Sequence, residues 1–294
     1  MIFIKDNQLT IKPKLQNESL ITQDTVINLL EDGTCTSTSW YSCVSSTNTT
    51  NGTIIQPVLS GRINTKLGAS IKYGRVEVKA KIAKGDWLWP AIWMLPVVDT
   101  YGEWPRSGEI DILEARGNNY TYASGGNNFD FSALHWGPNA QNDGYRLTEN
   151  NKPSLHSQLG DGFHTYGLEW SEKYLFTYLD NILHQVMYFK FDAPLYPQAY
   201  FPSADQNGSA LTNPWASTGR DNSPFDQEFY LIINVAVGSQ NGWFTDGKDG
   251  KPWVDSSPTA KKDFWDARAQ WLPTWQKEGS GQMVVDSVKM WQQC

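Results

Sequence analysis

Polar and apolar residues alternate with a period of two in two stretches of the chain, residues 8–14 and 74–82. Alternation with this period predicts strands that bury one face and expose the other. Further apolar and aromatic runs have the length of strands and are separated by clusters of Gly, Asn, Pro and Asp. These additional predicted strands cover residues 91–95, 109–114, 131–136, 164–170, 175–179, 229–237 and 284–291.

Helical periodicity is scarce by comparison. One helix is predicted over residues 260–271, where Phe264, Ala267 and Trp271 recur on one face. Many strands without intervening helices indicate an all-β fold, an antiparallel sandwich with one short surface helix. No linker-like stretch or internal repeat interrupts the pattern, so we expect residues 1–294 to form a single domain.

The predicted strand 109–114 carries three carboxylates among apolar residues. In a regular strand Glu109 and Asp111 share one face, whereas Glu114 points to the other face, among the isoleucines. An unpaired carboxylate in an apolar layer is costly. One extra residue, a β-bulge near Ile112 and Leu113, would return Glu114 to the face of Glu109 and Asp111. The pattern therefore predicts three acids in one row.

A row of carboxylates suits the cleavage of a glycosidic bond. That reaction needs one carboxylic acid to protonate the leaving oxygen and one carboxylate to attack or to activate water. Two other interpretations compete, a Ca²⁺ site and an acidic face without a function. Carboxylates on one strand converge poorly on a cation, so the Ca²⁺ interpretation is the weaker one.

The aromatic content changes the picture, because the chain holds 14 Trp, 13 Tyr and 12 Phe, while only 19% of its residues are charged. Part of the Trp is expected to fill a wide β core. The remainder could pave a groove for sugars, whose CH faces stack on indole rings. A net charge of -7 without a compensating basic run argues against nucleic acid as a partner. No apolar run approaches the roughly 20 residues that cross a bilayer, so no membrane partner is expected.

Cysteines and glycosylation sequons bear on the compartment. Cys35 and Cys43 flank a short Ser/Thr-rich loop, and their spacing predicts a disulfide. Cys294 is then an odd thiol at the end of the sequence. Residues 1–5 do not resemble a secretion signal, so any such signal has been removed or lies outside this sequence. Asn-x-Ser/Thr sequons weakly favour a secreted glycoprotein and lie at Asn17, Asn48, Asn51, Asn119 and Asn207.

Several collinear motifs resemble glycoside hydrolase family sixteen. They are YGRVEVKAK at residues 73–81, GDWLWPAIWMLP at 85–96, WPRSGEIDILE at 104–114, LHWGP at 134–138 and PFDQEFYLIINVAVG at 224–238. The resemblance covers about residues 5–291. Within the family, the chain most resembles the laminarinase (endo-1,3-β-glucanase) branch and the related β-1,3-glucan-recognition proteins of invertebrate immunity.

The resemblance implies a β-jelly-roll with a concave substrate cleft and a retaining double displacement through a covalent glycosyl-enzyme. By motif position, Glu109 matches the nucleophile, Asp111 the assisting acid and Glu114 the general acid/base. The resemblance also implies that no cofactor or catalytic metal is required. It allows a structural Ca²⁺ on the convex face. We expect a secreted monomer.

The same resemblance suggests substrate-binding residues. Trp104 matches a sugar-stacking Trp ahead of the nucleophile, and His135 matches a cleft histidine near the acid/base, with a core or rim histidine as the alternative. Trp89 and Trp93 share strand parity, and one of them could belong to the core instead. Two weaker candidates are Arg62, toward the distal subsites, and Asn234, which could face the cleft or satisfy backbone groups.

Two functions are compatible with these motifs. An endo-acting hydrolase of β-1,3-glucan is favoured, because the related recognition proteins typically lack the catalytic acids and this chain keeps all three. A non-catalytic β-1,3-glucan-recognition protein of innate immunity is the alternative. Activity on mixed 1,3-1,4 linkages and transglycosylation are also open. In the family, a further stretch with the first strand normally precedes the segment that resembles residues 3–14, so this domain could lack that strand.

Overall fold

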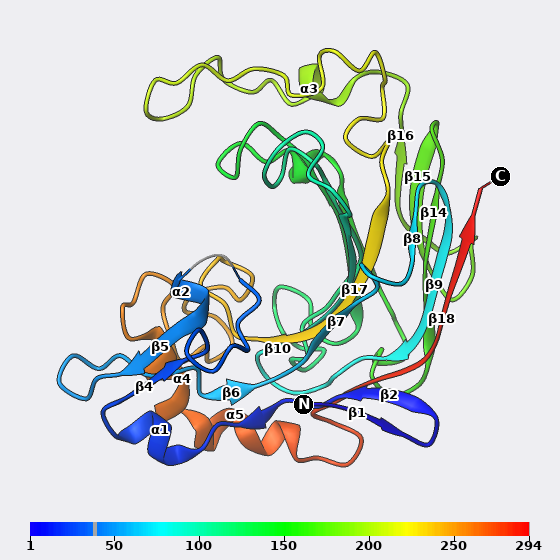
Figure 1. Cartoon of the computed structure of the whole chain (residues 1–294). Coiled ribbons are helices and arrows are strands. Elements are labelled where there is room, and N and C mark those ends of the chain that lie inside the picture. The colour runs from blue at the N-terminus through cyan, green and yellow to red at the C-terminus, as the bar shows by residue number, and fades with distance from the viewer. Residues whose placement is uncertain (38–39, 294) are drawn as a thin grey trace.

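Two curved antiparallel sheets form the body of the protein in a computed structural model that describes residues 1–37 and 40–293. The outer sheet is convex and lies on the right of Figure 1. Its strands in spatial order are β1 (Ile2–Lys5), β2 (Gln8–Ile11), β18 (Met283–Gln292), β9 (Gly74–Lys81), β14 (His164–Trp170), β15 (Tyr174–Leu179) and β16 (Gln185–Lys190).

The inner sheet packs against the concave side of the outer sheet and lies to its left in Figure 1. Its strands in spatial order are β13 (Glu149–Pro153), β12 (Phe129–His135), β11 (Glu109–Glu114), β10 (Leu88–Pro96), β17 (Phe229–Val237) and β7 (Arg62–Asn64), and β8 (Ser70–Ile71) also pairs with β17. Neighbouring strands of this sheet pair antiparallel. The predicted all-β sandwich is therefore confirmed.

The core lies between the two sheets because alternate residues of each strand point inward. In β9, Val76, Val78 and Ala80 are fully buried, and in β11 Ile110 and Ile112 meet them from the other sheet's side. Tryptophan divides as expected between core and other positions. Eight of the fourteen are buried, namely Trp87, Trp136, Trp170, Trp215, Trp253, Trp265, Trp271 and Trp275.

A smaller lobe, at the lower left of Figure 1, combines N-terminal and C-terminal segments. Two short antiparallel strand pairs belong to it, β3 (Lys14–Leu15) with β6 (Val58–Leu59) and β4 (Thr25–Asn28) with β5 (Val44–Thr47). Its helices are α1 (Glu18–Thr22), α2 (Trp40–Cys43), α4 (Ala260–Asp266) and α5 (Arg268–Trp275). A short helix α3 (Leu195–Gln198) and a 3-10 turn η1 (Tyr145–Leu147) lie elsewhere, α3 at the top of the figure.

The single helix predicted over residues 260–271 is wrong in detail. The chain leaves helical geometry at Ala267, with φ −82° and ψ 9°, so that α4 and α5 form two helices that meet there. The expected apolar face holds nonetheless. Phe264 and Trp271 are buried and their rings stack 4.3 Å apart. Sequence periodicity identified the buried side chains but not the break between the helices.

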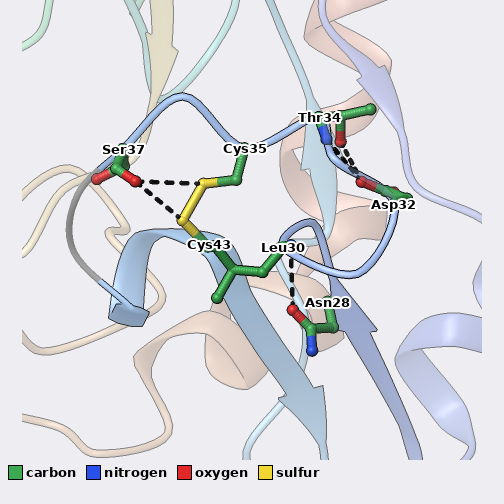
Figure 2. The surroundings of a disulfide bond; sticks show 7 residues. All are labelled: Asn28, Leu30, Asp32, Thr34, Cys35, Ser37 and Cys43. Carbon is green, nitrogen blue, oxygen red and sulfur yellow. Dashed lines mark hydrogen bonds between the residues drawn. A yellow bond between two sulfur atoms is a disulfide. The ribbon is translucent and has the colours of Figure 1, made fainter.

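The disulfide between Cys35 and Cys43 is present, with 5.6 Å between the Cα atoms (Figure 2). The Ser37 carbonyl lies 3.6 Å from Cys43 Sγ and 3.9 Å from Cys35 Sγ. The bridge closes a loop of the small lobe, as the spacing predicted. Cys294 lies outside the described residues. The expectation that the domain lacks the first strand of the family stays a prediction. None of the described helices is long and apolar enough to cross a bilayer.

Candidate active site

A β-bulge in β11 places its acidic residues. On one side of the strand, Asp111 pairs with Trp93 and Leu113 with the adjacent residue Ile92, so Ile112 is the extra residue. On the other side, Asp111 pairs with Ala133 and Glu114 with Phe131 of β12. Glu114 follows Asp111 by three residues, whereas their two partners are only two residues apart. The bulge predicted from side-chain parity is confirmed, and it allows Glu114 to leave the core while Leu113 stays in it.

Glu109 and Glu114 open into the same cleft on the inner sheet. The cleft has a volume of about 500 Å³. It is lined by Ser60, Gly61, Arg62, Trp89, Ala91, Trp93, Glu109, Glu114, Asn234, Val235 and Ala236. Six of the residues singled out from the sequence therefore meet here. Asp111 is buried beneath the cleft.

Glu109 is held by an indole group. Trp104 Nε1 donates a hydrogen bond to Glu109 Oε2 over 2.8 Å. The Trp104 residue is 42% exposed to solvent. Burial raises the pKa of the Glu109 carboxyl well above its usual value. The negative charge of Asp111 raises this pKa further, while the positive charge of His135 and the Trp104 hydrogen bond lower it.

Glu114 has a similar but separate arrangement. Trp89 Nε1 donates to Glu114 Oε1 over 2.9 Å. Burial raises the pKa of Glu114 to about 8, and Asp111 contributes in the same direction. His135, Trp89 and Arg116 oppose this shift. Glu114 is therefore predominantly protonated at neutral pH, which suits a proton donor.

His135 lies opposite Glu109 on β12, and its charge also acts on Glu114. Its Nε2 lies 3.2 Å from Asp111 Oδ2, and its Nδ1 lies 2.5 Å from Asp143 Oδ2. Burial by itself lowers the pKa of His135, but the two carboxylates outweigh it and raise the pKa to about 12. The imidazole ring is thus a cation. It stacks on Tyr145 with 5.2 Å between ring centroids.

Trp93, Asn234 and Arg62 form one connected group across three neighbouring strands. Trp93 Nε1 donates to Asn234 Oδ1 over 2.6 Å, and the Arg62 guanidinium lies 4.5 Å from the centre of the Trp93 ring. Asn234 and Trp93 both line the cleft, so neither serves only the core or the backbone. Trp89 also lines the cleft, and it is partly buried and packs against the main core.

Sequence reasoning missed two residues behind Trp89. The Trp243 ring stacks on Trp89, with centroids 4.7 Å apart and an interplanar angle of 13°. The Arg116 guanidinium lies 3.8 Å from the Trp243 ring centre, and its Nε donates to the Trp243 carbonyl over 2.8 Å. Burial lowers the pKa of Arg116 to about 10. The position of Arg116, two residues after Glu114, is the one sequence signal that could have revealed this stack.

One cluster of potential metal ligands occurs among the described residues, and it belongs to this row. Ligand atoms of Glu109, Asp111 and His135 lie within 4.8 Å of one another. Both ring nitrogens of His135 already face carboxylates, Nε2 at 3.2 Å from Asp111 and Nδ1 at 2.5 Å from Asp143. The expectations that no cofactor is required and that a structural Ca²⁺ binds elsewhere stay predictions.

Comparison with protein families gives one match. Residues 31–220 match the family model described as glycosyl hydrolases family 16. A β-1,3-glucan-binding protein of Penaeus monodon is 40% identical over 302 residues, covering 98% of this chain and 79% of that protein. Gram-negative bacteria-binding protein 1 of Drosophila melanogaster is 31% identical, and the matched region spans 98% of this chain and 56% of that protein.

Hydrolases also occur among the similar proteins. A glucan endo-1,3-beta-glucosidase A1 of Niallia circulans is 38% identical over 180 residues, covering 61% of this chain and 22% of that protein. Two solved structures share the fold. The laminarinase catalytic domain of Thermotoga maritima has a TM-score of 0.55 at 19% identity, covering all of this chain and 80% of that one. The laminarinase of Rhodothermus marinus has a TM-score of 0.54 at 23% identity, with 99% and 81% covered.

Proposed function

Because this chain belongs to glycosyl hydrolase family 16, we propose that it hydrolyses internal bonds of β-1,3-glucan with retention of configuration. The observation that carries the proposal is the row on β11. Glu109 and Glu114 open into one cleft, and each receives a hydrogen bond from a different tryptophan of that cleft region. A double displacement requires two carboxyl groups at the substrate cleft, one as nucleophile and one as general acid/base.

In the first step the Glu109 carboxylate attacks the anomeric carbon, and Glu114 gives its proton to the departing glycosidic oxygen. The C–O bond to the leaving sugar breaks as the bond to Glu109 forms. In the second step Glu114, now ionised, takes a proton from water. The water oxygen attacks the anomeric carbon and displaces Glu109.

Burial raises the pKa of both glutamates, and the neighbouring groups act on each of them separately. Glu114, with a pKa of about 8, holds the proton at neutral pH. The pKa of Glu109 is also raised, so the row does not carry three full negative charges in the free protein. Strand register places the His135 cation directly opposite Glu109, and Trp104 donates to the same carboxylate. Both contacts favour the ionised form of Glu109 that a nucleophile needs.

The cleft suits a neutral polysaccharide. The rings of Trp89, Trp93 and Trp104 offer flat apolar faces for the CH surfaces of pyranose rings. Arg62 and Asn234 add hydrogen-bonding groups for hydroxyls. The names of the Penaeus and Niallia relatives point to β-1,3-glucan as the polymer, and we adopt 1,3 as the preferred linkage.

The test is hydrolysis of laminarin, compared with lichenan, followed by reducing-sugar release and by proton NMR of the first products. We expect release from laminarin and the β-anomer as the first product. Early release of products of mixed length is expected of an endo-acting enzyme. A folded protein that releases no reducing sugar, or an α-anomer that appears first, would contradict the proposal. Faster cleavage of lichenan would change the linkage preference, and products longer than the substrate would indicate transglycosylation.

A non-catalytic glucan-recognition protein is the second candidate, because several similar proteins are named β-1,3-glucan-binding proteins. Calorimetric titration with laminarin oligosaccharides separates the two candidates. Binding without any cleavage by the unaltered protein would support recognition alone. Cleavage that disappears in Glu109→Gln while binding persists would support the hydrolase.

We also propose that the protein is secreted, glycosylated and monomeric. A disulfide closes the Cys35–Cys43 loop, and bonds of this kind persist in oxidising compartments. The asparagines of all five sequons are exposed, as glycan attachment requires. Expression in secreting eukaryotic cells, with a mass decrease after enzymatic deglycosylation, tests glycosylation and export together. Light scattering tests the monomer, and the predictions of no nucleic-acid or membrane partner stand as expectations.

A further inference from the structure

A second pocket lies beside the cleft, where β17 ends. Its volume is about 310 Å³, at the lower end of the range of about 300 to 1,000 Å³ that is typical of small-ligand sites. We call it the side pocket. It is lined by Gln56, Pro57, Val58, Ser60, Val237, Gly238, Ser239, Gln240, Trp253, Ala260, Lys261 and Phe264.

The side pocket continues from the cleft. Ser60 lines both, and β17 passes from Asn234 and Ala236 in the cleft to Val237 in the side pocket. The cleft residues follow the order β11, β10, β17 and β7 across the inner sheet, from Glu109 to Arg62. A glucan chain that crosses these strands away from Glu109 therefore reaches the segment just before Arg62, which also borders the side pocket.

The wall of the side pocket is rigid and largely apolar. Trp253 and Phe264 belong to the main core and are 4% and 6% exposed. Phe264 is backed by Trp271, and Trp253 Nε1 donates to the Ser239 carbonyl over 2.7 Å. The hydrogen bond fixes the loop that carries Ser239 against the core. A wall of this kind can accept the apolar face of a sugar ring without rearranging.

Three polar side chains line the same pocket without partners in the described part of the chain. Ser239 Oγ is buried and makes no hydrogen bond. Gln56 and Lys261 are exposed at the mouth of the pocket, and no hydrogen bond or ion pair joins their side chains to another described residue. The next lysine on α4, Lys262, is different because it pairs with Asp266. Buried polar groups are normally satisfied, so the unpaired Ser239 hydroxyl is the group that points to a ligand, with Gln56 and Lys261 near it on the pocket rim.

We propose that the side pocket binds one glucosyl residue of the same glucan whose backbone occupies the cleft. This inference rests on the proposed function. The ring lies against Val58, Trp253 and Phe264, while its hydroxyls accept from Lys261 and exchange hydrogen bonds with Ser239 and Gln56. The residue reaches the pocket either as the next unit of the main chain or as a single-unit branch. The shared chemistry is a neutral pyranose with several hydroxyls.

The experiment measures binding by calorimetry in a Glu109→Gln background, which prevents turnover. The ligands are laminaritriose, longer linear 1,3-oligosaccharides, and oligosaccharides of matched length with one glucosyl branch. Lys261→Met keeps an unbranched side chain as far as Cε and removes the ammonium group. We expect it to raise the Kd of ligands that reach the side pocket by about tenfold and to leave the Kd of laminaritriose unchanged. Lys262→Met is the matched control and should behave like the background protein.

Ser239→Ala is the second variant, since it removes the buried hydroxyl and adds no atoms to the pocket wall. If the Kd rises only for long linear ligands, the side pocket binds a unit of the main chain. If the Kd rises only for branched ligands, it binds a branch. Equal Kd values for the two variants and the Lys262→Met control, on every ligand, overturn the proposal. An equal loss on laminaritriose overturns it too, because the effect would then lie in the cleft.

Failure of the proposed function has a different signature. If the protein without any substitution neither binds nor cleaves any 1,3-glucan, the function and the side-pocket proposal fall together. If it does bind or cleave but the variants match their control, only the side-pocket proposal falls.

Discussion

Each of the two sheets carries glutamates on the face that points away from the shared core, but the two faces treat them differently. On the outer sheet, Glu77 forms an ion pair with Arg75 at 3.2 Å and accepts a hydrogen bond from Tyr178 Oη at 2.7 Å. Glu169 accepts from Tyr174 Oη at 2.8 Å. On the inner sheet, Glu109 and Glu114 accept from indole N–H groups and form no ion pair with a described Lys or Arg.

The difference shows that strand alternation alone does not make a reactive acid. Both sheets turn their glutamates outward by the same period of two. The outer glutamates have a cation or a phenol within reach. The inner glutamates are desolvated beside Asp111, which raises their pKa values and keeps a proton within the row. A carboxyl group that holds a proton at neutral pH can donate it during catalysis.

The largest expected effect separates the two faces directly. Glu109→Gln removes the proposed nucleophile, and we expect laminarin hydrolysis to fall by about 10³-fold or more. Glu77→Gln, on the outer sheet, should leave the rate within about twofold, because surface substitutions of this kind perturb stability only slightly. Initial rates of reducing-sugar release measure both. Similar losses of hydrolysis rate in the two variants would show that the glutamates of the two sheets do not differ in their role.

Glu114 provides the next test, through pH. The donor must be protonated for the first step, so kcat/KM should fall as pH rises through about 8, the pKa of Glu114. Glu114→Gln should lower kcat/KM by about 10²- to 10⁴-fold and remove this alkaline limb. A pH profile from 5 to 10, taken at roughly constant ionic strength, measures the limb. An unchanged limb in the variant would assign the titration to another group.

Arg116 sharpens the comparison, because it is the buried cation nearest in sequence to the inner row. Its positive charge lowers the pKa of Glu114, so Arg116→Met should move the alkaline limb to higher pH. Loss of the contact with Trp243 should also loosen Trp89 and reduce kcat/KM on the order of tenfold. Arg268→Met is a matched control, since Arg268 lies 4.3 Å from the Trp265 ring and does not line the cleft.

The readout for Arg116 distinguishes positioning from stability. A simple loss of stability would lower the unfolding temperature and leave the pH of the limb in place. A carbon-13 titration of the Glu114 carboxyl measures the same shift even without turnover. If neither the limb nor this titration moves, Arg116 has only a packing role.

The smallest effect on activity is expected from the disulfide. The bridge closes a short loop across a sequence separation of 8 residues in the small lobe, and neither cysteine lines the cleft. Replacing both cysteines with serine should lower the free energy of unfolding by about 2.5 kcal/mol, with activity retained. Denaturant unfolding, with the reduced unaltered protein for comparison, measures the change. A large loss of activity would link this loop to the cleft.

Much of the fold was accessible from sequence periodicity. The long strands of both sheets lie where alternation or apolar runs predicted them, with shifts of a few residues at their ends. The missed strands are short or polar and lie at sheet edges or in the small lobe; they are β1, β4, β5, β6, β7, β8, β13 and β16. Such strands exist only through their pairing partners, so their own sequences carry little signal.

The candidate site divides in the same way. The sequence by itself determined the acidic row and its bulge, because side-chain alternation is local and a carboxylate left in the core would be costly. It did not determine the stack of Arg116, Trp243 and Trp89, nor the side pocket around Ser239 and Lys261. Only the tertiary structure decided these features. They join loops and strands more than a hundred residues apart, and contacts at that range follow no period along the chain.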